Sequence, residues 1–389
     1  MSSPREPSRG GPTVHVWNGY SLAERDRRWA AVRAQAAAAG LDCVWVPLGD
    51  GVDGRYLTQL RCSSIVLPSD GRDAIVVADR GSRNSWVPEP RLIGRDWPEP
   101  MAQALMDAGM EGRRIGVVGL HGGVLSHVRA ADGVAVHSAL EHVRQRLPRA
   151  EFVDATDVVG RVRYVKSEEE IACLRRAVEI AEAGVDELIA GAKPGVDMAG
   201  LYARVMGRML RMGSEYYPLA LSLDGERHTN PAAGLSLEAG TLLGSEVSAV
   251  WGTQVAQQDQ PIFFGTPPTS WQAAIDLQRR AFERGLEIMK PGATVGELLD
   301  GIAALRTPEL RVAVLLHGRG AGDDGPLVSP RSSGEAARSL RFETGNAFVW
   351  KPTVTAKDGF AFTWGGTIVI TSRGAERLFQ QEHGLVRRA

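Results

Sequence analysis

The sequence predicts an α+β protein of two domains, a small α/β domain followed by a larger domain made of two similar α/β halves. Its 389 residues are more than one hydrophobic core usually holds. Helix-like and strand-like segments alternate through residues 21–163. A Lys-Pro-Gly sequence occurs at 193–195 and again at 290–292, each time after an amphipathic segment, which indicates an internal duplication.

The first domain is expected at residues 21–163. The N-terminal MSSPREPSRGGP is polar and lacks the apolar core of a signal peptide, so we expect a disordered leader at residues 1–20. A helix is predicted from Ser21 to the residue before Gly40, because Ser21 and Glu24 have the spacing of a capping box. Strands are expected at 43–47, 64–68, 73–78 and 114–120, and a further helix at 138–147.

The second domain is expected at residues 164–389. Ser167 and Glu170 form another capping-box pattern, and an apolar stripe follows through residues 171–188. In each copy of the repeat, Lys-Pro-Gly ends one helix because proline cannot continue it. The next helix is predicted to start at Asp197 in the first copy and at Thr294 in the second.

A charged residue interrupts one strand of this domain. Residues 348–371 read FVWKPTVTAKDGFAFTWGGTIVIT, two apolar runs joined by the turn-like AKDG. The first run carries Lys351 between Trp350 and Pro352. A buried amine needs ionic partners or a path to solvent, so Lys351 is a candidate site residue.

The composition excludes some classes of function. Lys plus Arg (45) nearly balance Asp plus Glu (46), so no net charge attracts nucleic acid or a membrane surface, and a small ligand is favoured. Cys43, Cys62 and Cys173 are scattered, without zinc-site or disulfide spacing. No run is long enough to span a bilayer, and we expect a cytoplasmic protein.

Several motifs resemble those of one known family. They are RYVKSEEEIACLRRA at 163–177, the doubled Lys-Pro-Gly, LSLEAGTLLGSEVS at 235–248, HGRGAG at 317–322 and GTIVITSRGAERL at 366–378. Their order resembles the creatinase and X-prolyl aminopeptidase family over nearly the whole chain from Ser21. The resemblance implies a C-terminal pita-bread domain with an internal duplication, behind a smaller creatinase-like α/β domain. It also implies a homodimer.

The resemblance also identifies the positions of metal ligands. Metalloenzymes of the family hold two divalent ions with two Asp, one His and two Glu. The matching positions here are Glu246, Gln257 (with Asp259 two residues on), His317, Lys351 and Gly365. Most of these side chains cannot complete a cage for hard cations, so we expect neither a metal nor a cofactor. Lys351 would supply one fixed positive charge and pair with Glu246 or Asp259. Alternatively, it is an ion-paired remnant of a lost site.

Creatinase itself hydrolyses a C–N bond without metal and uses a histidine as acid–base catalyst, in a His-Asn-Pro turn. His228 in HTNPAAG occupies a similar place, twelve residues before Gly240. We therefore predict catalysis by His228 with His317, Lys351 and Glu246. Each histidine has a structural alternative: His228 could cap a loop, and His317 could be satisfied by nearby backbone.

The candidate ligand-binding residues share motif positions around this site. They are Asp259, Gln257, Arg319, Asp324, Trp364, Trp251, Tyr217, Tyr56 and Arg61. Tyr56 and Arg61 would act in trans, across the dimer. Lys351 favours an anionic or neutral small molecule or a short peptide. Three functions stay open: metal-independent cleavage of a C–N bond, a pseudo-peptidase that only binds, and a conventional aminopeptidase whose ligands are shifted in the alignment.

Overall fold

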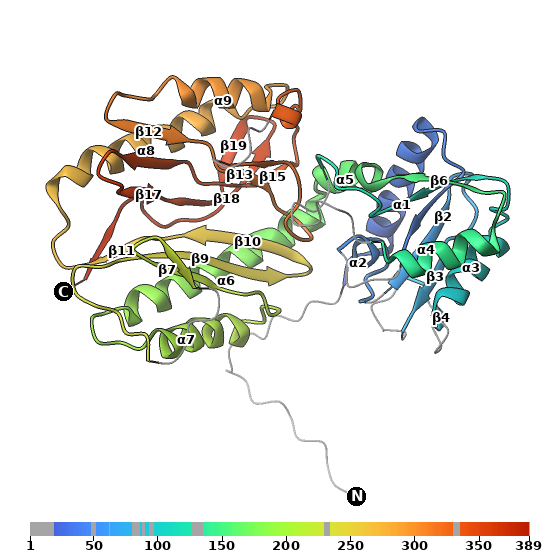
Figure 1. Cartoon of the computed structure of the whole chain (residues 1–389), viewed down its shortest axis with the longest axis horizontal. Helices are drawn as coiled ribbons and strands as arrows, with labels where there is room; N and C mark the ends of the chain where they lie inside the picture. Colours follow the sequence, from blue (N-terminus) through green and yellow to red (C-terminus); the bar gives the residue numbers. More distant parts are fainter. Residues whose placement is uncertain are drawn as a thin grey trace, which may run out of the picture.

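The computed structural model describes residues 19–47, 52–61, 63–79, 86–87, 90–92, 97–125, 135–228, 234–329 and 335–388, and for Leu92, Arg227 and His228 the backbone only. The expected leader lies outside these ranges except for its last two residues. Of these, Tyr20 is buried and its hydroxyl donates to the Gly252 carbonyl, 2.5 Å away, so the ordered chain begins before residue 21. Figure 1 shows two domains side by side.

A mixed sheet with helices on both faces forms the first domain. The order of its described strands is β4-β3-β2-β1-β5-β6, with β1 parallel to β5 and antiparallel to β2. The strands are β1 (Cys43–Val46), β2 (Ser63–Pro68), β3 (Ile75–Ala78), β4 (Arg91–Leu92), β5 (Arg114–Val117) and β6 (Glu151–Asp154). The helices are α1 (Leu22–Ala38), α2 (Val52–Thr58), α3 (Pro98–Asp107), α4 (His137–Arg146) and α5 (Thr156–Tyr164).

The alternation of β1 explains the two layers of helices. Val44 and Val46 pack with α1, α2 and α5, whereas Cys43 and Trp45 pack with α3 and α4. Successive side chains of a strand point to opposite faces, so a strand that is apolar at every position must be covered twice. The strands and helices predicted for this domain are confirmed, with ends that differ by a few residues.

The capping box predicted at the start of α1 is only half formed. The Ser21 hydroxyl accepts from the Glu24 N–H at 3.1 Å, but the Glu24 carboxylate binds Arg27 and Arg28 instead of turning back. The Ser21 N–H donates to Glu169 of the second domain, at 3.0 Å. A contact between domains therefore replaces a local one, which the sequence pattern could not show.

Two helix pairs flank the strands of the second domain. They are α6 (Glu168–Gly191) with α7 (Met198–Arg211), and α8 (Gln272–Ile288) with α9 (Val295–Ala303). The Ser167 capping box is complete, and Asp197 and Thr294 cap α7 and α9 as predicted. Figure 1 shows the strands of this domain between the two helix pairs. The arrangement is the pita-bread architecture expected from the sequence.

The described strands of this domain form a large sheet and a small one. The large sheet has the order β14-β13-β15-β18-β10-β9-β11-β20, with β7, β8 and β19 attached at its sides, and the small sheet has the order β12-β16-β17. The large-sheet strands are β7 (Ala220–Leu223), β8 (Glu226–His228), β9 (Leu242–Trp251), β10 (Gln254–Asp259), β11 (Ile262–Phe264), β13 (Leu316–Gly318), β14 (Leu327–Val328), β15 (Ala347–Trp350), β18 (Gly365–Thr371), β19 (Gly374–Arg377) and β20 (Val386–Arg388). The small sheet contains β12 (Leu310–Ala313), β16 (Thr353–Ala356) and β17 (Ala361–Thr363), and short 3-10 turns lie at Thr269–Trp271 and Glu335–Ala337.

Strand alternation separates a helix-covered face from a face that carries polar groups. Val247 and Ala249 of β9 pack against α6 and α7, so Glu246 and Ser248 face the other way. Trp350 of β15 packs against α8, where its indole N–H donates to the Phe282 carbonyl at 3.0 Å. The next residue, Lys351, therefore points away from α8. In the part of the chain that the structure describes, no helix combines the length and hydropathy of a membrane span.

Candidate functional site

The Lys351 ammonium lies between two carboxylates. Its Nζ is 2.7 Å from Glu246 Oε1, and 3.3 and 3.1 Å from the two carboxylate oxygens of Asp259. The side chain of Lys351 is 2% exposed, compared with 8% for Asp259 and 26% for Glu246. The pairing expected from the sequence is confirmed, and Lys351 does not extend to solvent.

Three strands bring these groups together. Gln258 of β10 pairs with Val247 of β9, so Asp259 and Glu246, one step further, face each other. Lys351 follows β15 directly. Burial by itself would lower the pKa of Lys351, but Asp259 and Glu246 outweigh burial and raise that pKa above its usual value. Lys351 is therefore charged throughout the physiological pH range.

A cavity of about 440 Å³ opens beside this triad, and we call it the Lys351 cavity. Besides the triad, its walls include Ala220, Leu221 and Ser222 of β7, Leu315, and Ala361 and Thr363 of β17. The triad has two acidic groups and one basic group. With both carboxylates ionised it does not attract an anion, and a polar group without charge suits this end of the site best.

His317 on β13 is buried and neutral. Its Nδ1 lies 3.2 Å from the Gly318 carbonyl. Burial, together with the positive charges of Arg319 and Lys351, lowers its pKa to about 3. An imidazole with so low a pKa is a weak base at neutral pH. The predicted role of His317 in proton transfer is therefore not favoured, although the residue lies near the triad.

Arg319 and Tyr217 form a second polar group. The Arg319 guanidinium binds the Asp323 carboxylate, and the Tyr217 hydroxyl lies 3.3 Å from Asp323 Oδ1 and 3.5 Å from Arg319 Nη1. Burial opposes the charge on Arg319, but Asp323 outweighs burial and raises the pKa of Arg319. Asp323 was not singled out in the sequence, since nothing in HGRGAGDD distinguishes it from its neighbour.

A cavity of about 390 Å³ lies between the domains. Tyr56 and Arg61 of the first domain line it together with Tyr217. Glu215 accepts from Arg61 at 2.5 Å and from Arg55 at 2.7 Å, so one carboxylate offsets part of the positive charge of the two arginines. Tyr56 and Arg61 thus reach a cavity of their own chain, and their predicted role across a dimer stays a prediction.

Asp324 does not line either cavity. It is buried against Arg163, and its second oxygen lies 3.2 Å from the Lys166 ammonium. Arg163 also binds Asp53 of the first domain, at 2.5 Å. Its carboxylate is held by two cations of the RYVK segment and helps to join the domains, so the structure does not bring this predicted ligand-binding residue to either cavity.

Two other predicted ligand-binding residues, Trp364 and Trp251, do not line either cavity. Trp364 packs in the core against Phe282 and Phe379, with ring centroids 4.9 and 5.3 Å away, because it points opposite to the cavity-lining Thr363. Trp251 lies on the helix-covered face of β9, where the Arg176 guanidinium is 5.5 Å from its ring. The sequence motif gave the strands of these residues but not their orientation.

Two further predicted residues are placed only in part. The backbone of His228 pairs with Leu221, which lines the Lys351 cavity, but the His228 side chain lies outside the described residues. Gln257 lies two positions before Asp259, so both point to the same face of β10. Its backbone exchanges hydrogen bonds with the Thr367 hydroxyl, and its buried Oε1 has no partner among the described groups.

The donors near Lys351 do not fit a divalent ion. Across the described residues, no three His, Cys, Asp or Glu side chains come together as ligands would. The space between Glu246 and Asp259 is occupied by an ammonium group, which repels a cation. Gly365 has a φ of 152°, and a Cβ there would lie 2.1 Å from the Trp350 carbonyl oxygen and 3.0 Å from Lys351 Cβ. A larger side chain cannot replace Gly365 without a shift of this backbone.

Comparisons with known proteins agree with this architecture. The profile of Metallopeptidase family M24 matches residues 172–372, just over half of the chain. An uncharacterized hydrolase/peptidase, y4tL of Sinorhizobium fredii, is 26% identical over 317 residues, 75% of this chain and 77% of its own. A creatinase of Bacillus sp. is 22% identical over 408 residues, 95% and 94% of the two chains.

Solved structures show the same fold. The Xaa-Pro dipeptidase of Bacillus anthracis superposes with a TM-score of 0.77 at 16% identity, covering 93% of this chain and 99% of that chain. The class is thus a two-domain α+β protein with a pita-bread domain behind a small α/β domain. The chain belongs to metallopeptidase family M24.

Proposed function

We propose that the protein is a hydrolase that cleaves a C–N bond of a small neutral or anionic molecule without a divalent ion. The observation that carries the proposal is the Lys351 ammonium, fixed between Glu246 and Asp259 at the wall of a 440 Å³ cavity. Membership of family M24 supports hydrolysis, and the similarity to a creatinase supports a small-molecule substrate.

Lys351 acts as the electrophile. An ammonium has three N–H donors, and two of them are directed at Glu246 and Asp259. The third can donate to the carbonyl oxygen of an amide or a urea. As water adds to the carbonyl carbon, negative charge develops on this oxygen while Glu246 takes up a proton, so the ammonium then faces one ionised carboxylate and can stabilise the oxygen by a directed hydrogen bond.

Glu246 is the proton acceptor that the described cavity offers. It is the most exposed group of the triad and lines the cavity beside Lys351. It takes a proton from the attacking water and returns it to the leaving nitrogen, so that the C–N bond breaks with hydroxyl on carbon and hydrogen on nitrogen. His228 is the alternative acceptor, since its strand pairs with β7 at the cavity wall.

The test is turnover by chelator-treated protein with N-acyl amino acids, short peptides and ureas. We expect activity to survive metal removal and to be unchanged by added Mn²⁺ or Co²⁺. Glu246→Gln is expected to lower kcat by about 100-fold or more. Lys357→Met, in the exposed turn between β16 and β17, is the matched control for Lys351→Met. Activity that appears only with added metal would refute the proposal.

A second function, ligand binding without turnover, is favoured by one observation. Lys351 is fully ion-paired within the chain, and His317 is neutral and bonded to backbone, so neither needs a substrate to be satisfied. A peptide or small molecule that binds to the wild-type protein but stays intact on prolonged incubation would select this alternative. Loss of that binding in Lys351→Met would locate it at the same cavity.

A further inference from the structure

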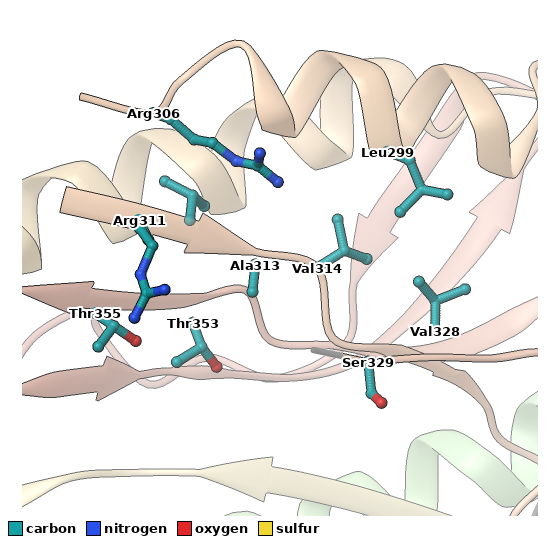
Figure 2. A pocket seen from close by; sticks show the side chains of 10 residues that line it. Leu299, Arg306, Arg311, Ala313, Val314, Val328, Ser329, Thr353 and Thr355 are labelled. Carbon is teal, nitrogen blue, oxygen red and sulfur yellow. The ribbon is translucent and has the colours of Figure 1, made fainter. Parts of the chain in front are cut away.

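A larger cavity, of about 560 Å³, lies at the outer edge of the small sheet. We call it the β12 cavity. Figure 2 shows Arg311, Thr353 and Thr355 at one end of the cavity, with Leu299, Val314 and Val328 at the other end. Arg306, from the segment between α9 and β12, extends over the same cavity.

The pairing of the small sheet connects the β12 cavity with the Lys351 cavity. Arg311 pairs with Thr355, which pairs with Ala361; Ala313 pairs with Thr353, which pairs with Thr363. Directly paired residues point to one face of a sheet. The first two residues of each row line the β12 cavity, and the last lines the Lys351 cavity.

Hydroxyl groups mark the junction of the two cavities. Thr353 Oγ1 and Thr363 Oγ1 lie 2.8 Å apart, one in each cavity. The opposite face of this sheet is apolar: Val354 and Phe362 are buried in the core, and Val312 reaches only the β12 cavity. The face that carries the threonines therefore forms one surface that leads from the triad, across two threonines, to Arg311.

The charges at the two ends of this surface differ. At the triad, two carboxylates outnumber one ammonium. At the other end, Arg306 and Arg311 are exposed, and among the described residues neither forms an ion pair. A guanidinium that is not already neutralised binds a carboxylate by charge-assisted hydrogen bonds.

We infer that the ligand is an elongated molecule with an uncharged amide or urea group beside Lys351 and a carboxylate bound by Arg311. This assignment rests on the proposed function for the reacting end only. Residues 351 and 355 are four positions apart, so the two ends are separated by about 13 Å along an extended strand. Arg306 strengthens the positive potential at the rim without contacting the carboxylate.

A series of N-acetyl amino acids tests the inference. N-acetylglycine has the amide and the carboxylate close together, whereas N-acetyl-8-aminooctanoate separates them by a seven-carbon chain. The methyl ester of the long compound has the same length without the charge. We expect the long acid to bind at least 10-fold more tightly than either comparator in calorimetry at low salt.

Arginine variants locate the anionic end. Arg311→Gln is expected to weaken the binding of the long acid by about 10-fold and to leave the affinities for N-acetylglycine and the ester unchanged. Arg306→Gln is expected to weaken the binding of the long acid two- to threefold at low salt, and this effect is expected to disappear at high salt. Arg373→Gln, an exposed arginine in the turn between β18 and β19, is the control and is expected to change nothing.

The outcomes separate this inference from the proposed function. If the long acid binds no better than N-acetylglycine, or if Arg311→Gln has no effect, the inference is wrong even where turnover occurs. If the long acid binds through Arg311 but neither it nor any other compound of the turnover test is cleaved, the inference holds and the hydrolase proposal fails. A further outcome would also overturn the inference: the long acid still binds to Lys351→Met in a way that depends on Arg311, and the ester does not bind. The whole ligand would then lie in the β12 cavity.

Discussion

Replacing Lys351 by methionine should destabilise the protein in a pH-dependent way. The variant keeps the length of the side chain but leaves Glu246 and Asp259 facing each other. Their contacting oxygens lie 2.7 and 3.1 Å from the Lys351 Nζ, so they are no more than about 6 Å apart. At an effective dielectric of about 20, two negative charges at that distance repel each other by roughly 3 kcal/mol.

Independent measurements on other proteins give a similar magnitude. Removal of one partner from a buried ion pair costs about 3 to 5 kcal/mol. We therefore expect the free energy of unfolding to fall by about this amount at pH 7. Lys357→Met, on the neighbouring turn, should change it by less than about 0.5 kcal/mol.

The sign of the pH dependence follows from the charges. In the variant, repulsion between the two carboxylates raises the folded-state pKa of one of them above its unfolded value. As the pH falls, this carboxylate takes up a proton, and the loss in free energy of unfolding relative to the wild-type protein becomes smaller. In the wild-type protein, the pKa of Lys351 is raised. Its contribution is therefore fully present below the unfolded-state pKa, near 10.4, and is lost as the pH rises through the folded-state value.

Urea unfolding followed by tryptophan fluorescence, at about pH 5, 7 and 9, measures these effects. A Lys351→Met variant as stable as the wild-type protein at pH 7 would refute the reasoning. So would a deficit of the same size at pH 5 and pH 7, because the loss would then come from packing and not from charge.

Three other predictions concern groups near the site. The ring of His317 should stay neutral from about pH 5 to 8, because its pKa is about 3, and an ¹⁵N NMR titration that moves in this range would contradict this. Gly365→Ala places a methyl group 2.1 Å from the Trp350 carbonyl oxygen and should cost roughly 3 kcal/mol or more. Gly359→Ala, at a φ of 92° with nothing within 4 Å of the added methyl group, should cost less, and equal losses would exclude the steric explanation. Arg163→Met should lower the free energy of unfolding by about 3 kcal/mol, since it removes the arginine that binds the half-buried Asp53 and one of the two cations that bind the buried Asp324, and an unchanged urea midpoint would show that the domains do not depend on it.

Local signals in the sequence were sufficient for most of the fold. Ser167, Asp197 and Thr294 cap their helices because a cap depends on residues within one turn. Ser21 shows where such signals fail. Its expected partner Glu24 has two arginines within reach, and its own N–H finds Glu169 in the other domain. A competing contact from a distant segment leaves no trace in the local pattern.

The predictions for the candidate site differ in the same way, between contacts that follow from local spacing and contacts with distant segments. Lys351 could be paired with Glu246 and Asp259 because each follows from spacing within a recognised strand. Asp324 could not be placed, since its partners lie about 160 residues earlier, in the RYVK segment. To place Trp364, one must know which face of its strand packs against the helices. An apolar run that is buried on both faces does not reveal this orientation.

The close approach of Gly365 to Lys351 bears on how this site can change in evolution. A side chain at 365 would collide with the strand that holds the lysine, so a larger residue there requires that strand to shift. Replacements at 351 and 365 are therefore expected to be epistatic: what position 365 tolerates depends on the backbone at 350 and 351. A carboxylate at 365 would be reached only together with a change in the neighbouring strand, and not by a single stable step.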